Sequence, residues 1–232
     1  MDAKKVTAIV TRAVPYGDTD MIVTLVSIEE GKLTVTAKGC LKPKAKLRYA
    51  TEPMNFGEYM LAGKPERLVL ADCSQIDSFS PITLDIEKYY AAALILEGLQ
   101  KLSPESQPTL FMHAIEVLKG MAYEGKSAED SVTKFLTYAL TDNGYEVDFS
   151  TCNLCKCILD GDAVFSEKDG IVCPHCADYT GTGIDAITRA YLAGENLDIP
   201  THLKNNANMV LADLIGQVLG LRLGKHYFTE LL

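Results

Sequence analysis

The sequence predicts an α+β protein of more than one domain, in which a five-stranded β-barrel precedes an all-α domain that carries a four-cysteine zinc knuckle. Three observations predict it. Residues 1–80 alternate short β-rich runs with turn residues, whereas beyond residue 81 apolar side chains recur at helical spacing. Two Cys-x2-Cys pairs, 17 residues apart, interrupt the helical part. We expect domains at 1–80 and 81–232, with the knuckle inserted at about 150–179.

Five short strands are expected in the first domain. The first three are rich in β-branched residues, and glycine or proline occurs in every connection between the strands. The second and third are joined by Glu29-Glu30-Gly31, which signals a hairpin. The expected strands cover residues 6–11, 21–28, 32–37, 55–61 and 67–71. Five such strands with no helical period among them favour an OB-type barrel, a fold whose loops bind oligonucleotides.

The second domain is expected to be helical because its apolar residues repeat every three to four positions. The breaks at 103–104 and 124–127 are short, which favours antiparallel packing of successive helices. The apolar stripes cover residues 92–102, 111–122, 132–140, 185–192 and 210–221.

Four cysteines predict one structural Zn²⁺ site. Two thiolates three positions apart turn onto one side of an ion, and two such pairs complete a tetrahedral sulfur shell that leaves no place for water or substrate. The expected ligands are Cys152, Cys155, Cys173 and Cys176. Such a site would hold together about 30 residues, too few for a core of their own. Disulfides are the weaker interpretation, and Cys157 or His175 stays an alternative to one ligand.

A basic run follows the third expected strand. Between residues 38 and 48 five cations occur without an acid, and in an extended segment four of them would point the same way, as a phosphate backbone requires. The candidate DNA-binding residues are Lys38, Lys42, Lys44, Lys46 and Arg48. The alternative interpretation is a solvated loop whose charge only maintains solubility.

Aromatic residues near this run are candidates for stacking on nucleic-acid bases, although each one is as readily explained by the barrel core. They are Tyr16, Tyr49, Phe56 and Tyr59. No base-reading helix accompanies them, so the sequence predicts binding to phosphates that is independent of base sequence.

Net charge is distributed unevenly. The whole chain carries −9, but residues 1–80 hold 11 Lys and Arg against 10 Asp and Glu, and residues 81–232 hold 11 against 21. Local field rather than total charge decides where a polyanion docks. Because Arg12 breaks the first apolar stretch and residues 89–96 are too short for a membrane helix, we expect no secretory signal or membrane span and a cytoplasmic protein, which binding to DNA would place at the nucleoid.

Catalytic patterns are absent from the sequence: there is no P-loop, G-x-G-x-x-G, H-E-x-x-H or G-x-S-x-G motif, and the histidines are scattered. We therefore expect no enzyme. A zinc hydrolase or deaminase is the weakest alternative, because the H-x-E element before P-C-x-x-C lacks its histidine.

Taken together, the pattern resembles the RecO family of bacterial recombination mediators over essentially the whole chain. Besides the basic run and the cysteine pairs, five short segments carry the resemblance. They are Tyr16-Gly17-Asp18-Thr19-Asp20, Glu30-Gly31-Lys32, Ala37-Lys38-Gly39, Val164-Phe165-Ser166 with Asp169-Gly170, and Leu219-Gly220 with Lys225 and Phe228. The sequence departs from the family at Leu41, where another cation is common, and at Lys156, where glycine is common.

The resemblance implies an N-terminal OB-fold, a helical domain and a zinc module. It implies binding of single- and double-stranded DNA, annealing of complementary strands, and work with RecR to load RecA onto strands coated by single-strand DNA-binding protein. Members also dock the C-terminal tail of that coating protein, for which Arg222, Lys225 and Phe228 are our candidates. The rival hypothesis from another class is a zinc-ribbon protein-interaction scaffold with no direct DNA role.

Overall fold

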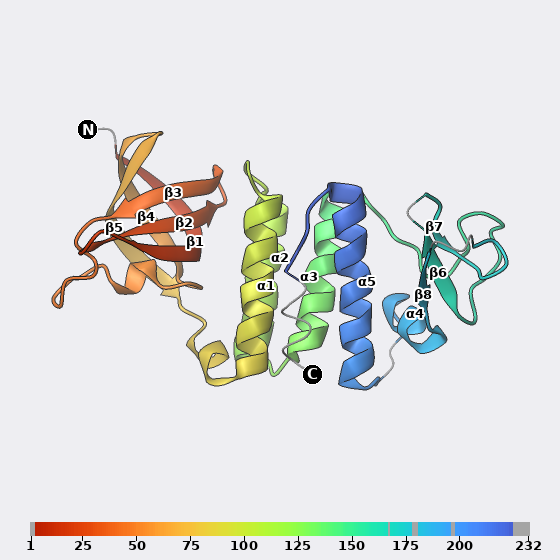
Figure 1. Cartoon of the computed structure of the whole chain (residues 1–232). Helices are drawn as coiled ribbons and strands as arrows, with labels where there is room; N and C mark the ends of the chain where they lie inside the picture. Colours follow the sequence, from red (N-terminus) through yellow and green to blue (C-terminus); the bar gives the residue numbers. More distant parts are fainter. Residues whose placement is uncertain (1–2, 167, 178–180, 196–197, 225–232) are drawn as a thin grey trace. The chain divides into compact units, whose positions relative to one another are not determined.

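The computed structural model describes residues 3–166, 168–177, 181–195 and 198–224 (Figure 1). The chain forms two compact units, residues 1–126 and 127–232. The boundary expected at residue 80 marks the change from strand to helix, and as a domain boundary it stays a prediction. Within the described residues, no helix is both long and apolar enough to cross a bilayer.

The first unit contains a closed five-stranded barrel, which confirms the predicted OB-type architecture (Figure 1). Its strands follow the order β1-β2-β3-β5-β4 around the barrel, and all neighbours are antiparallel except β3 and β5. The strands are β1 (Ala3–Tyr16), β2 (Asp20–Ser27), β3 (Gly31–Ala37), β4 (Phe56–Lys64) and β5 (Arg67–Asp77). Each is as long as or longer than its apolar run indicated, because polar residues at strand ends still pair in the ladder.

Alternation of side chains builds the barrel core. Inward-facing Val, Leu and Ala side chains from all five strands are almost fully buried, and Tyr59 fills the centre with no exposed surface. Its hydroxyl accepts a hydrogen bond from Asn55 Nδ2 at 2.6 Å and so satisfies a polar group that burial would otherwise penalise. The barrel is held by its own apolar interior.

Two helices complete the first unit after a 3-10 turn, η2 (Ser80–Leu84). They are α1 (Ile86–Leu102) and α2 (Pro108–Tyr123). Asp85 caps α1 by accepting the backbone N–H groups of Glu87 and Lys88, which would otherwise lack partners. The Phe56 and Phe111 rings lie 6.0 Å apart, so α2 packs against the barrel.

Gly31 lets the segment between α1 and α2 approach the β2–β3 hairpin. Its φ is +72°, and a Cβ there would lie 2.2 Å from the backbone carbon of Glu105. Any other residue would face both the left-handed conformation and this close contact. Gly17, in the β1–β2 turn, has a similar φ of +63° but open space around it.

The second unit combines three helices with a small sheet, drawn from green to blue in Figure 1. The helices are α3 (Ala128–Asp142), α4 (Ala186–Leu192) and α5 (Thr201–Leu219). The sheet has the order β7-β6-β8 and consists of β6 (Ala163–Ser166), β7 (Gly170–Val172) and β8 (Thr182–Ile184). We did not expect this sheet, because strands of three or four residues are too short to show a period.

Candidate functional site

The basic run forms a loop between β3 and a 3-10 turn, η1 (Tyr49–Thr51). Successive turns replace the extended segment considered above: the N–H of Lys42 donates to the carbonyl of Gly39, and that of Ala45 to the carbonyl of Lys42. All five cations are nevertheless exposed, whereas Leu41 and Leu47 between them pack against the barrel core. The apolar residues anchor the loop and leave its charges facing outward.

Two hydrogen bonds tie this loop to the β1–β2 turn. The backbone N–H of Gly39 donates to Asp20 Oδ1 at 2.7 Å, and that of Leu41 donates to the carbonyl of Thr19 at 2.9 Å. The hydrogen bond from Gly39, then the one from Thr19, and the nearby charges of the loop lysines lower the pKa of Asp20. Asp20 therefore stays ionised and holds the start of the loop in place.

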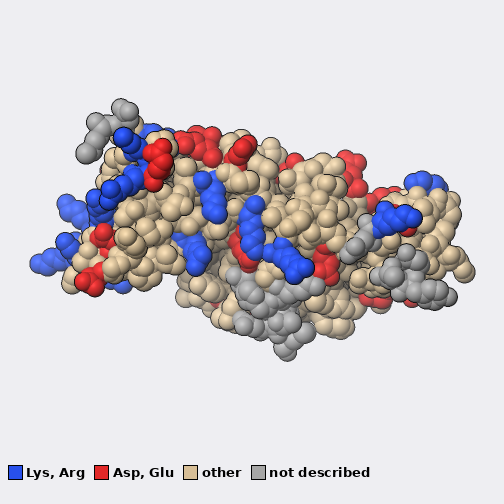
Figure 2. Space-filling model, turned by 45° about the horizontal axis from the view of Figure 1, so that its top comes forward, with Lys and Arg blue, Asp and Glu red and all other residues tan. Residues whose placement is uncertain are grey.

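The loop cations differ from Lys4 and Lys5, at the start of β1, in that they form no ion pair with any described residue. Lys4 and Lys5 form ion pairs with Glu30 and Glu58 at 2.5 and 2.7 Å. In the part of the chain that the structure describes, none of the five loop cations forms an ion pair. Figure 2 shows Lys and Arg side chains gathered over the barrel. This surface offers a polyanion five exposed cations that are not engaged in any of these ion pairs.

The four aromatic candidates fall into different environments. Tyr59 and Phe56 belong to the buried interior, and Tyr49 packs against it while its hydroxyl donates to the carbonyl of Cys73 at 2.6 Å. Tyr16, at the end of β1, is 62% exposed. Of these four rings, only that of Tyr16 is available to a ligand.

Five cysteines gather in the second unit, and they include all four predicted metal ligands. The sulfur atoms of Cys152, Cys155, Cys157 and Cys173 all lie within 4.8 Å of one another. The predicted fourth ligand, Cys176, lies close enough to the thiols of Cys173, Cys155 and Cys152 for them to raise its pKa. Which four act as ligands stays a prediction, because either Cys157 or Cys176 can complete a set of four. The other replacement considered, His175, is not part of the cluster found.

The spacing of these thiols suits a bound metal ion. Sulfurs at the corners of a tetrahedron around zinc would lie about 3.8 Å apart, given zinc–sulfur bonds of about 2.3 Å. The sulfurs of Cys155 and Cys173 are 3.9 Å apart, whereas a disulfide would require about 2 Å. All five are free cysteines. The cluster can hold one metal ion.

Local hydrogen bonding prepares part of the cluster for a cation. Burial raises the pKa of Cys152, but backbone N–H groups of Cys173, Cys155 and Leu154 outweigh that effect and lower it to about 6. Hydrogen bonding to neighbouring thiols, Cys155 for Cys157 and Cys173 for Cys176, raises the pKa of each to about 12. Several thiols cannot all ionise at this spacing without positive charge among them, as a metal ion would supply.

Two features around the cluster are not evident from the sequence. Lys156 has a φ of +61°, which explains why glycine suits this position, and its N–H donates to the carbonyl of Cys152 at 2.9 Å. Arg189, on α4, is 5% exposed, and its guanidinium donates to the carbonyls of Gly161 and Phe149, each at 3.1 Å. Nothing in the pattern around Arg189 identifies it, because its acceptors are backbone atoms far away in the sequence.

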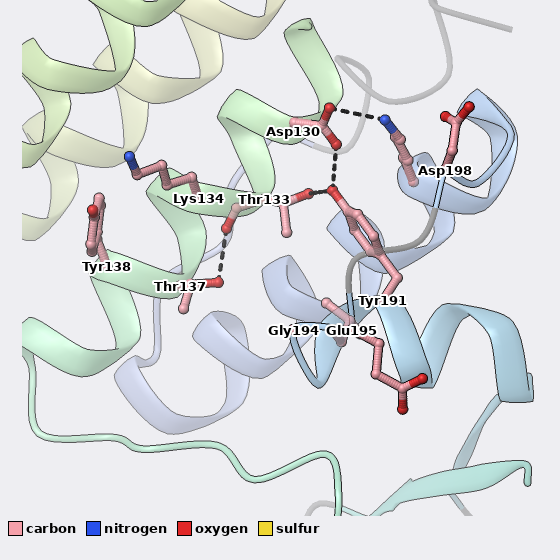
Figure 3. A pocket seen from close by; sticks show the side chains of 11 residues that line it. Asp130, Thr133, Lys134, Thr137, Tyr138, Tyr191, Gly194, Glu195 and Asp198 are labelled. Atoms are coloured by element: carbon pink, nitrogen blue, oxygen red, sulfur yellow. Dashed lines mark hydrogen bonds and ion pairs between the residues drawn. The ribbon is translucent and has the colours of Figure 1, made fainter. Parts of the chain in front are cut away.

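A pocket of about 750 Å³ lies between α3, α4 and α5 (Figure 3). Along one side, Asp130 accepts hydrogen bonds from the Tyr191 hydroxyl at 2.7 Å and from Lys204 Nζ at 2.9 Å. Thr133 bonds to the same hydroxyl and donates to Asn208 at 2.7 Å. These groups satisfy one another and link three helices, so their evident role is structural. The Ser127-x-x-Asp130 capping pattern was the one sequence signal for this network.

Two predicted docking residues, Lys225 and Phe228, and the expected end of the knuckle, Tyr179, lie outside the described residues. The third docking candidate, Arg222, is described and exposed, just after α5.

Comparison with known proteins gives a consistent result. Residues 1–79 match the family model "Recombination protein O N terminal", and residues 83–198 match "Recombination protein O C terminal". Among relatives, the DNA repair protein RecO of Shouchella clausii is 32% identical over 75% of this chain and 68% of its own length. Proteins of the same name from Acetivibrio thermocellus and Bacillus cytotoxicus are 25% and 26% identical over 99% and 98% of this chain, and over 92% and 96% of their own lengths.

Proposed function

Because the chain belongs to the RecO family of recombination and DNA repair proteins, we propose that it binds DNA through the barrel and anneals complementary single strands. The single observation that carries this proposal is the loop of residues 38–48. Its five cations are exposed, form no ion pair among the described residues, and are fixed to the barrel by the partly buried Leu41 and Leu47 and by Asp20.

The mechanism needs no covalent chemistry. Lys38, Lys42, Lys44, Lys46 and Arg48 would neutralise phosphates without reading bases, because contacts to the backbone carry no sequence information. Two strands held on one surface meet at a high effective concentration, so pairing becomes nearly intramolecular. The acidic remainder of the chain would oppose indiscriminate coating of DNA.

The metal that suits this cluster best is one structural Zn²⁺ ion, since soft thiolates at tetrahedral spacing select it. Cys152, Cys155 and Cys173 would hold the ion together with Cys176, as the sequence predicts, or with Cys157. With all positions filled by thiolates, the ion would supply cross-linking and no catalysis.

Membership of the RecO family extends the proposal to partners and cellular location. The protein would act in the cytoplasm at the nucleoid, with RecR, to assist RecA loading onto strands coated by single-strand DNA-binding protein, whose C-terminal tail it would dock. Arg222 supports the docking site only as an exposed cation at the end of α5.

A protein-interaction scaffold is the second candidate function. It is favoured by two apolar side chains on the cysteine module, Leu154 and Ile158, which are 51% and 78% exposed. An annealing assay separates the candidates, because only the first predicts that the protein accelerates pairing of coated complementary strands.

Salt dependence tests the DNA-binding proposal directly. If about four loop cations contact phosphates of a single strand, the slope of log affinity against log salt concentration is about −3. A triple variant that combines Lys42→Ala, Lys44→Ala and Lys46→Ala should have a slope of only about −1. The matched control replaces Lys4, Lys5 and Lys64 by alanine, which removes the same charge from elsewhere on the barrel. Equal loss in both variants, or a wild-type slope near zero, would contradict a phosphate-binding loop.

A further inference from the structure

Tyr16 occupies an unusual position for a large ring in this barrel. It is the last residue of β1, and its side chain is 62% exposed, although aromatic side chains contribute most when buried. Of the other tyrosines in the barrel, Tyr59 is buried and Tyr49 is half-buried. The core gains nothing from the exposed ring of Tyr16.

The sheet register places this ring beside the start of the basic loop. Tyr16 pairs with Asp20 across β1 and β2, and Met21 pairs with Ala37 across β2 and β3. Lys38, the first residue of the turn after β3, lies close enough to Asp20 for its charge to act on that carboxylate. Residues opposite one another on adjacent strands project from the same face. Two strand spacings separate the Cα atoms of Tyr16 and Lys38 by about 10 Å. One nucleotide can span this gap, with its base on the ring and a phosphate at the ammonium group.

Asp20, between them, makes the arrangement rigid. Its carboxylate accepts the N–H of Gly39 at 2.7 Å and the hydroxyl of Thr19 at 2.8 Å, and Leu41 bonds to the carbonyl of Thr19. The ring and the cations are therefore positioned before a ligand arrives, which reduces the entropy lost on binding.

From this geometry we infer that Tyr16 is a stacking platform for an unpaired base, and that it makes the barrel favour single strands over duplex. The inference rests on the proposed DNA-binding function and adds a second kind of contact to the same surface. Every base has an apolar face, so stacking is tolerant of sequence, whereas bases within a duplex already stack on their neighbours. Only the phosphate contacts are available in both single-stranded and duplex DNA.

The chain contains no tryptophan, so Tyr16→Trp introduces a unique fluorescent probe at the platform. A thymine homo-oligonucleotide is expected to quench its emission, and a duplex of the same length is expected to leave it nearly unchanged. Tyr123→Trp is the matched control, because Tyr123 belongs to the same unit and is 56% exposed. Equal quenching by single strand and duplex, or equal quenching in the control, would overturn the inference.

Affinity provides the second test. Tyr16→Ala is expected to weaken single-strand binding about tenfold or more and to change duplex binding little, while Tyr16→Phe retains the affinity and Tyr16→Leu does not. The exposed position lets all three fold, which their melting temperatures check. If Tyr16→Ala leaves single-strand affinity unchanged while the triple lysine variant loses affinity, the stacking inference is overturned and the proposed DNA-binding function stands. Absence of DNA binding by the unmodified protein overturns the proposed function as well.

Discussion

The barrel of residues 3–77 and the cysteine module of residues 150–184 are stabilised in different ways. The barrel closes a ladder of five strands around a continuous apolar core. The module has three strands of three or four residues and a cluster of five thiols, of which only those of Cys152 and Cys173 are buried. A domain with enough apolar residues is stable by burial, whereas a short insert needs a cross-link. The two regions should therefore respond differently to the same kinds of change.

Loss of the metal should have the largest effect, and only on the module. Structural zinc binds with an apparent free energy of about 10–16 kcal/mol in small domains, so Cys173→Ser should lose the ion and expose β6, β7 and β8 to hydrogen exchange. Barrel amides should keep their protection. Metal analysis of Cys157→Ser and Cys176→Ser identifies the fourth ligand, since only one of them should release the ion.

Loss of barrel protection in Cys173→Ser would break the comparison, because it would show that the two regions unfold together. The control is Cys73→Ser, which changes a cysteine of the barrel core and should leave the metal content unaltered.

A backbone substitution should have the next largest effect, and only in the first unit. Gly31→Ala should destabilise it by about 3 kcal/mol, since the residue combines a left-handed φ with a contact to the backbone of Glu105. Gly17→Ala shares the left-handed φ but not the contact, and should cost about 1 kcal/mol. Chemical denaturation of the two variants measures both values. Equal losses would show that the contact with Glu105 contributes nothing.

A smaller change in the opposite direction is expected at Lys156. Glycine adopts the left-handed conformation without strain, so Lys156→Gly should stabilise the metal-bound module by about 1 kcal/mol. Competition with a chelator would detect this stabilisation as tighter metal binding and slower metal release. A matched Lys168→Gly variant, in the loop between β6 and β7, should show no such gain.

Low pH should have the smallest effect, a loss of stability in the hydrogen-bond network around Asp130 that links α3, α4 and α5. Burial raises the pKa of Asp130, but hydrogen bonds from Ser127, Lys204 and Tyr191 outweigh it and lower the folded-state pKa below 3.8. A carboxyl group whose pKa is lower in the folded state than in the unfolded state stabilises the fold at pH values above its unfolded-state pKa. This contribution disappears as the pH falls through the folded-state pKa, below about pH 4. Because the Asp130 side chain is 43% exposed, the effect is less than about 1 kcal/mol. Asp130→Asn should flatten the acid dependence of unfolding, and an unchanged profile would exclude Asp130 as its source.

Sequence patterns predicted the regions where one residue type repeats at one spacing. Alternation revealed the barrel strands, the 3.6-residue period revealed the helices, and paired cysteines indicated the module. They did not predict which rings are exposed, because Tyr16 and Tyr59 look alike in the sequence and only closure of the barrel separates them. They offered Cys157 and His175 equally as alternative ligands, and only the turn of the chain at Lys156 shows that Cys157 joins the cluster.

Arg189 has a consequence for how the module can change during evolution. Its guanidinium binds two main-chain carbonyls, at Phe149 and Gly161, on either side of the first cysteine pair. Carbonyl groups are present whatever the side chain, so the two hydrogen bonds do not depend on which residues occupy the anchor positions. They do depend on the arginine itself. Relatives that diverge throughout the insert should therefore still share this one basic residue on the helix behind it.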